Sequence, residues 1–284
     1  MAGASSPDWW RHSHELGTVS SYWQIFHVGI QNTLAYRANF FVRALFNLVP
    51  LTAMLAMWRV IYEGKSGDIA GYSLQEMASY YLLATLVEAM TCVTEDDWQI
   101  SAEIKDGQIS QFLMRPIDYL HYRFSLFWSG RVVYALAALA PTGLFIAWNH
   151  ELLLPPPDSS AFACLLLSLV LSAILQFLLS CIVAMLAFWV LEISTFVFVL
   201  LAFERLTAGQ MFPLDLLPGW LTHALMWTPF PYCTYFPVSI YLGNISGAAL
   251  VNGLLMQVFW VATIYGIARA MWCRGLKTYT VVGG

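Results

Sequence analysis

Long apolar runs with few charges dominate the pattern of hydrophobic and polar positions along the chain. The hydrocarbon core of a bilayer is about 30 Å thick, and a helix needs roughly 20 apolar residues to cross it. By this criterion the sequence predicts an all-α polytopic membrane protein. One nearly uninterrupted apolar stretch supplies both the fourth and the fifth span, with the turn expected within 183–192. The six predicted transmembrane helices are at about 40–61, 73–94, 124–147, 160–185, 190–208 and 248–271.

Two further segments are predicted to lie in the membrane without crossing it. In 21–38 the apolar residues fall mostly on one helical stripe, which is typical of an amphipathic helix in the membrane interface. In 211–243 the apolar pieces between prolines are too short to span a bilayer. They predict two short helices that enter the membrane and return on the same side, a re-entrant hairpin. Its marker residues are Pro213, Pro218, Trp220, Pro229 and Pro237.

Composition supports the membrane assignment. Hydrophobic residues make up 59% of the chain and charged residues only 11%, whereas a soluble domain has about 25% charged residues. The net charge of −4 is small and gives no indication of nucleic-acid binding. The five cysteines show neither a CxxC motif nor a Cys/His metal-binding spacing, so they are interpreted as small buried residues.

The positions of Lys and Arg set the expected orientation, because these residues collect in the cytoplasmic loops of membrane proteins. Both termini and the 95–122 loop are expected in the cytoplasm, and the 211–243 hairpin is expected on the outer side. The predicted organisation is a tail and interfacial helix at 1–38, a single transmembrane domain at 39–271 and a cytoplasmic tail at 272–284. The basic residues on the predicted cytoplasmic side are Arg11, Arg37, Arg43, Lys105, Arg115, Arg123, Arg269, Arg274 and Lys277.

The largest soluble segment is the loop between the second and third spans. Its apolar residues fall into two short helical patterns separated by Asp106–Gly107, and Pro116 ends the second pattern. So short an amphipathic element has little core of its own, and its apolar face is expected to need a partner. Two interpretations remain open: a helix lying on the bilayer, or a docking element for a cytoplasmic protein. An acidic cluster at 95–97 favours docking, because anionic lipid headgroups would repel it.

Charges inside the spans are the other candidate functional groups, since ionisable residues in a membrane are costly. Glu88 and Arg131 either pair across adjacent helices, or Glu88 simply reaches the interface. Glu204 and Arg205 are interpreted as solvated charges at the membrane surface. The sequence contains no complete nucleotide-binding motif and no catalytic motif such as GxSxG or HExxH, so no enzymatic activity is predicted for the chain itself.

The order of these elements resembles the permease subunit of type-two ATP-binding-cassette (ABC) exporters, in the six-span branch with a separate ATPase subunit. Three sets of residues carry the resemblance. The first is the pattern IxxGxIxxxLxRPI at Ile104, Gly107, Ile109, Leu113, Arg115, Pro116 and Ile117. The second is Phe188–Trp189. The third is Gly209, Pro213, Leu214, Leu217, Pro218, Trp220, Pro229, Phe230, Tyr235, Pro237 and Gly243.

The resemblance implies transport driven by ATP and Mg²⁺ that bind to a partner ATPase, with no cofactor in this chain. It also implies a second permease chain, as a homodimer or heterodimer, and a bacterial cytoplasmic (inner) membrane location. The 95–122 loop would then carry a coupling helix on which the ATPase docks. The implied docking residues are Trp98, Ile104, Gly107, Ile109, Phe112, Leu113, Arg115 and Pro116.

Two other function classes remain as alternatives. A membrane-embedded lipid-modifying enzyme would need acidic residues and His gathered at one membrane face, for which Glu95, Asp97 and His121 offer a weak cluster. An ATP-independent secondary transporter typically shows inverted repeats and helices broken near the bilayer midplane. The transported substrate stays open, with lipid-like, amphipathic and glycan molecules all compatible with the apolar spans.

Overall fold

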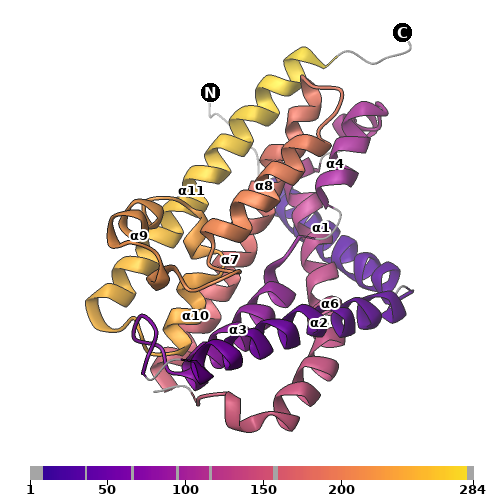
Figure 1. Cartoon of the computed structure of the whole chain (residues 1–284). Coiled ribbons are helices and arrows are strands. Elements are labelled where there is room, and N and C mark those ends of the chain that lie inside the picture. Colours follow the sequence, from indigo (N-terminus) through magenta and orange to yellow (C-terminus); the bar gives the residue numbers. More distant parts are fainter. Residues whose placement is uncertain are drawn as a thin grey trace, which may run out of the picture.

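The fold was analysed in a computed structural model, which describes residues 9–35, 37–64, 67–93, 96–114, 117–155 and 159–279. These residues are helical apart from short connections, and no strand forms among them. The all-α prediction is therefore confirmed. Figure 1 shows the long helix α11 (Gly247–Thr278) along one flank of the molecule and α2 (Arg37–Glu63) crossing α6 (Tyr119–Trp148).

Among the described residues, four helices are long and apolar enough to cross a membrane: α2, α6, α7 and α11, with candidate spans at Ala38–Glu63, Tyr119–Trp148, Ala161–Phe188 and Gly247–Thr278. The whole helices are α2 (Arg37–Glu63), α6 (Tyr119–Trp148) and α7 (Ser159–Met185). Helix α3 (Leu74–Thr91) matches the second predicted span in position but is more polar, because it contains Gln75, Glu76 and Glu88. Helix α8 (Ser194–Thr207) is only about 21 Å long by helical geometry.

The connection between α7 and α8 explains why α8 is short. A single 3-10 turn, η2 (Leu186–Phe188), follows α7, and non-helical backbone continues until Ser194. This connection overlaps the turn predicted at 183–192, but it uses more residues than a tight turn would. The predicted fifth span at 190–208 thus loses its first residues to the connection.

At the N-terminus, α1 (Trp9–Ala35) begins earlier than the amphipathic helix predicted at 21–38. It packs along α6. The two helices approach so closely at Gly29 that a Cβ there would overlap the Ser129 side chain. One face of α1 is therefore held by protein.

Several connections between helices gather at two opposite ends of the bundle. At one end the side chain of Gln75 donates to the Glu151 carbonyl at 2.7 Å, and Ser79 donates to the Leu152 carbonyl at 2.6 Å. The Tyr72 hydroxyl donates to Asp215 there at 2.6 Å, so the 211–243 segment belongs to the same end. The helices α4 (Asp96–Lys105) and α5 (Ile109–Leu113) lie at the other end.

The 211–243 segment forms the short helices that its prolines predict. They are η3 (Leu214–Leu216), α9 (Gly219–Met226), η4 (Phe230–Tyr232) and α10 (Tyr235–Tyr241). Pro218 and Pro229 stand immediately before α9 and η4, while Pro213, Pro229 and Pro237 are buried. Tyr80 and Tyr81 on α3 hold the segment by donating to the carbonyls of Gly209 and Met211, both at 2.6 Å.

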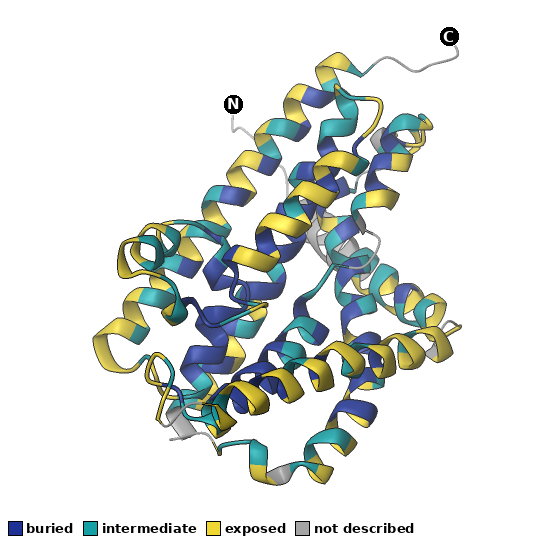
Figure 2. Cartoon of the chain, in the orientation of Figure 1, coloured by how far each residue is buried: buried dark blue, intermediate teal, exposed yellow. Residues whose placement is uncertain are grey.

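Helix α7 is the centre of the bundle. Within its apolar window 72% of residues are buried, against 17% for α2 and 11% for α11. Figure 2 shows the same contrast, with buried residues along the middle of the molecule and exposed residues on the outer helices. The exposed residues of α2 and α11 are largely apolar, as expected for helices that face lipid.

The close contact of α11 with the 211–243 segment gives a stability prediction. A Cβ at Gly253 would overlap the ring of the buried Phe236, whereas nothing lies within 4 Å of a Cβ at Gly266 on the same helix. We expect Gly253→Ala to lower the free energy of unfolding by about 1–3 kcal/mol through overpacking. Gly266→Ala should leave it unchanged or raise it by about 0.4–1 kcal/mol. Equal unfolding midpoints for the two variants in detergent micelles would contradict this packing.

Candidate functional site

The loop between α3 and α6 folds into two short helices joined by a tight turn. Gly107 lies between α4 and α5 with a φ of +77°, a left-handed conformation that favours glycine over other residues. The turn directs α5 away from the line of α4. Gly107, one of the predicted docking residues, therefore shapes the loop through its backbone.

The apolar face of the loop is buried inside the chain. Ile100, Ile104 and Ile109 are at most 3% exposed and belong to a cluster with residues of α7. The face does have a partner, but that partner is α7 of the same chain and neither the bilayer nor a cytoplasmic protein. The sequence could not predict this contact, because α7 is apolar on all sides. Such a helix has no polar stripe to show which of its faces packs against a neighbour.

The other predicted docking residues differ in exposure. Trp98 is 41% exposed and lies against Phe198 of α8, with ring centroids 6.5 Å apart. Phe112 is half-buried and contacts the rings of Tyr119 and Tyr122. Leu113 is the last residue of α5. Arg115 and Pro116 lie outside the described residues.

An ion pair joins the buried side of the loop to α6. The Arg123 side chain is 3% exposed and lies 2.6 Å from a carboxylate oxygen of Glu103 on α4. The same carboxylate accepts from the Tyr119 hydroxyl at 2.6 Å, and Arg123 donates to Gln99 at 3.1 Å. A buried charge is tolerated when it is paired and hydrogen-bonded in this way. This network fixes α4 on α6.

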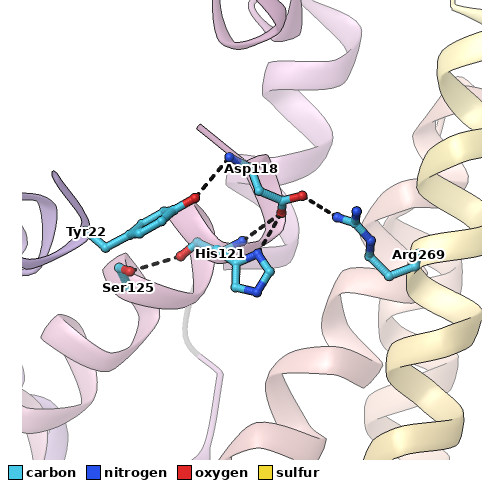
Figure 3. Close-up of polar contacts among 5 residues, drawn as sticks. All are labelled: Tyr22, Asp118, His121, Ser125 and Arg269. Atoms are coloured by element: carbon cyan, nitrogen blue, oxygen red, sulfur yellow. Dashed lines mark hydrogen bonds and ion pairs between the residues drawn. The ribbon is translucent and has the colours of Figure 1, made fainter. Parts of the chain in front are cut away.

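Asp118, just before α6, connects three helices (Figure 3). Its carboxylate accepts from the backbone N–H of His121 at 3.2 Å, which caps α6, and lies 3.0 Å from the His121 ring nitrogen Nδ1. The guanidinium of Arg269 on α11 donates to the other carboxylate oxygen. The backbone N–H of Asp118 donates to the Tyr22 hydroxyl of α1 at 3.0 Å. One residue thus ties α1, α6 and α11 together.

The charge of Asp118 is stabilised by these partners. Partial burial alone would raise the pKa of its carboxyl group, but the hydrogen bonds from Arg269 and His121 outweigh burial and hold the pKa below its usual value. Asp118 is therefore ionised at neutral pH and attracts the Arg269 guanidinium.

Aromatic packing continues the connection to α11. The rings of Tyr119 and Trp272 are stacked with centroids 4.6 Å apart and planes 3° from parallel. Phe188 of η2 packs on the same tryptophan at 5.7 Å, and a Cβ at Gly275 would overlap the Phe188 ring. The loop, the start of α6 and the end of α11 thus form one packed layer.

Glu88 and Arg131, the charges predicted to lie inside the spans, do not form the ion pair that was considered from the sequence. No ion pair joins Glu88 to Arg131 among the described residues. Arg131 instead donates to the Cys92 carbonyl and lies over the rings of Phe127 and Tyr134. Glu88 is half-buried and within electrostatic reach of arginines on α2 and α8.

The interpretation of Glu204 as a solvated surface charge is wrong. This side chain is 6% exposed and accepts a hydrogen bond from Gln176 of α7, while Arg205 next to it is exposed. The spacing of Glu204 seven residues after the buried Val197 was the available signal, because i and i+7 share a helix face.

Several residues of this end were not predicted. Asp118 could have been found, because an Asp directly before a long apolar run is a helix-cap signal. No local sequence pattern predicts the contacts of Glu103, Arg269 and Trp272, because each of these residues contacts a segment that is distant in the sequence. His121 pairs with Asp118, and Glu95 of the weak acidic cluster lies outside the described residues. The described residues include no group of three or more His, Cys, Asp or Glu that could hold a metal ion.

Comparison with known proteins gives one family match. A family model described as "ABC-2 family transporter protein" matches residues 48–283, which is most of the chain. No curated protein matches the sequence.

The buried ion pair gives a stability prediction. Glu103→Ala leaves the Arg123 guanidinium buried without its counter-ion, which costs about 3–5 kcal/mol. Glu151→Ala, at an exposed carboxylate on the opposite end, should change the free energy of unfolding by less than about 0.5 kcal/mol. Unfolding in detergent micelles tests both, and a small effect of Glu103→Ala would show that Arg123 finds other partners.

Asp118 gives a prediction about pH. Because its pKa is lower in the folded chain, its contribution to stability is present above the unfolded value of about 3.9 and is lost as pH falls through the folded value. The difference in thermal midpoint between wild type and Asp118→Asn should be largest near neutral pH and disappear in strong acid. The Arg269→Gln background should reduce this pH dependence, and an unchanged difference at all pH values would refute the charged interaction.

Proposed function

The chain belongs to the ABC-2 family of transporter membrane proteins, and we propose that this permease subunit exports its substrate with energy from separate cytoplasmic ATPase subunits. The observation that carries the proposal is the α4–α5 loop, which is packed on α6 and α7 on its inner side and exposed on its outer side. ATP and Mg²⁺ would bind to the partner ATPase, where the hydrolysis takes place.

The proposed topology has six membrane crossings, by α2, α3, α6, α7, α8 and α11. Its support is the gathering of several helix connections at two opposite ends. An even number of crossings brings both termini to the side that carries α4 and α5, which is the side rich in Lys and Arg and therefore cytoplasmic in the bacterial inner membrane. The segment containing α9 and α10 enters from the outer side and returns as a re-entrant hairpin. Trp220 and Trp227, 73% and 74% exposed, suit the headgroup layer there.

The proposed ATPase-docking surface is the outward side of the loop. The predicted residues Ile104 and Ile109 support this surface from beneath, and Gly107 sets its turn. Met114, directly after α5, is 82% exposed and gives this surface an apolar side chain. We define the docking surface by the exposed residues Ala102, Asp106, Gln108, Gln111 and Met114.

A second permease chain, identical or related, is proposed to cover the open faces of α2 and α8. Phe46 and Phe198 are 67% and 65% exposed on these faces, beside the exposed charges Arg43 and Arg205. Lipid tails solvate such charges poorly, so a protein partner or an aqueous pathway between two chains suits these faces better than lipid.

The docking surface gives the test of the proposal. When the chain is co-expressed with its ABC ATPase and purified through a tag, the ATPase should co-purify. Met114→Asp should abolish co-purification, because it places a charge at the exposed apolar contact. Glu151→Lys, an exposed change at the opposite end, should leave it intact. Retention of the ATPase by Met114→Asp would refute this surface. Transport by vesicles that lack any ATPase would refute the function itself and favour a secondary transporter.

A further inference from the structure

Helix α11 has one buried face, which runs from Gln257 to Gly275. Its buried residues are spaced by three, four and seven positions, so they share a single face of the helix. The helix has 32 residues and is about 48 Å long by helical geometry. The buried residues are Gln257, Ile264, Ala268, Trp272 and Gly275.

The end of this face near α6 is fixed to the first residues of α6, which follow the loop that the proposed function assigns to the ATPase. Arg269 binds Asp118, and Trp272 stacks on Tyr119. Figure 3 shows the Arg269 side chain extending from α11 toward Asp118 at the start of α6. Because Glu103 of α4 is bound to Tyr119 and Arg123, a displacement of the loop that moves the start of α6 acts on α11 through a charged contact and an aromatic contact.

The other end of the face is fixed to the 211–243 hairpin. The Gln257 side-chain amide is fully buried and donates to the carbonyl of Tyr232 at 3.0 Å, and to the Ser168 carbonyl and Ser172 hydroxyl at the same distance. One turn earlier, Gly253 lets the Phe236 ring approach the α11 backbone. Separating α11 from the hairpin would remove the Tyr232 carbonyl from the acceptors of this buried amide and would leave those of Ser168 and Ser172 on α7.

We infer that α11 is a strut that carries movement of the ATPase-side loop to the outer hairpin, with Arg269 and Gln257 as positioning residues at its two ends. These residues lie about 18 Å apart along an uninterrupted helix, which transmits displacement better than a chain of separate side chains. The inference rests on the proposed function, because the ATPase must supply the movement. It goes further by naming the element that links the two ends.

The competing route is α7, which also runs between the two ends and contacts α4, α10 and α11. The two routes differ at the Asp118–Arg269 contact, which joins the loop region to α11 without involving α7. Substitutions at this contact therefore separate the strut from the central helix.

The experiment uses the permease–ATPase complex in lipid nanodiscs, with spin labels at two pairs of exposed sites in a cysteine-free background. The pair Trp148→Cys and Trp227→Cys reports the hairpin, and the pair Ala102→Cys and Thr278→Cys reports the loop and the end of α11. In the wild type, ATP with vanadate should shift both distances. Asp118→Asn and Arg269→Gln should lose the hairpin shift, and Arg269→Lys should regain it by keeping the charge.

Gln257→Leu tests the other end of the strut. It should keep the shift at the loop pair and lose the shift at the hairpin pair, which a general loss of folding would not produce. His121→Ala, which alters an Asp118 partner outside α11, is the matched control and should keep both shifts.

A hairpin shift of wild-type size in Asp118→Asn and in Gln257→Leu would overturn the inference and favour α7. A wild-type complex that binds nucleotide without any hairpin shift would also overturn it. A wild-type chain that binds no ATPase would overturn the proposed function, and this inference with it.

Discussion

The buried charge of Arg123 is the constraint on which one end of the structure depends. A guanidinium cannot lose its proton at any physiological pH, so the chain must supply acceptors wherever it is buried. Glu103, Gln99 and Tyr119 supply them, and each comes from α4 or from α6 itself. Once α4 is held in this position, its isoleucines are buried against α7 and its polar side is turned outward. The contacts of Arg123 on the inner side of the loop thus determine which residues of the loop are exposed on its outer side.

Hydrogen bonds to the carboxylate of Asp215 organise the other end. Both carboxylate oxygens of Asp215 accept from tyrosines, Tyr72 and Tyr235, and Asn244 donates to the Tyr72 hydroxyl. Burial and the contact with Asp215 raise the pKa of Tyr72, so its hydroxyl keeps the proton that it donates. The hairpin is therefore attached to α3 and to the α2–α3 connection by directional bonds, while its tryptophans remain free to meet the membrane surface.

The sequence was sufficient to predict most of the helices but not the contacts between them. Apolar run length located α2, α6, α7 and α11, and the prolines located the short helices of 211–243, because both signals are local. The length of α8 and the burial of Glu204 were mispredicted, since each depends on how α7 and α8 pack. Ile104 and Ile109 were recognised as an apolar face, but the pattern could not show that α7 already covers them. Asp118 and Arg269 are too far apart in the chain for any local pattern to pair them.

The burial of α7 has a consequence for how the protein is made. Ribosomes synthesise α7 before α11, so Ser168 and Ser172 enter the bilayer before Gln257 and the hairpin are present to meet them. Polar groups that face hydrocarbon without hydrogen-bond partners are costly. Helix α7 therefore keeps unsatisfied polar groups until the last helix has been inserted. A chain truncated before α11 lacks more than one span, because its central helix keeps an unsatisfied polar face for the quality-control machinery of the membrane to recognise.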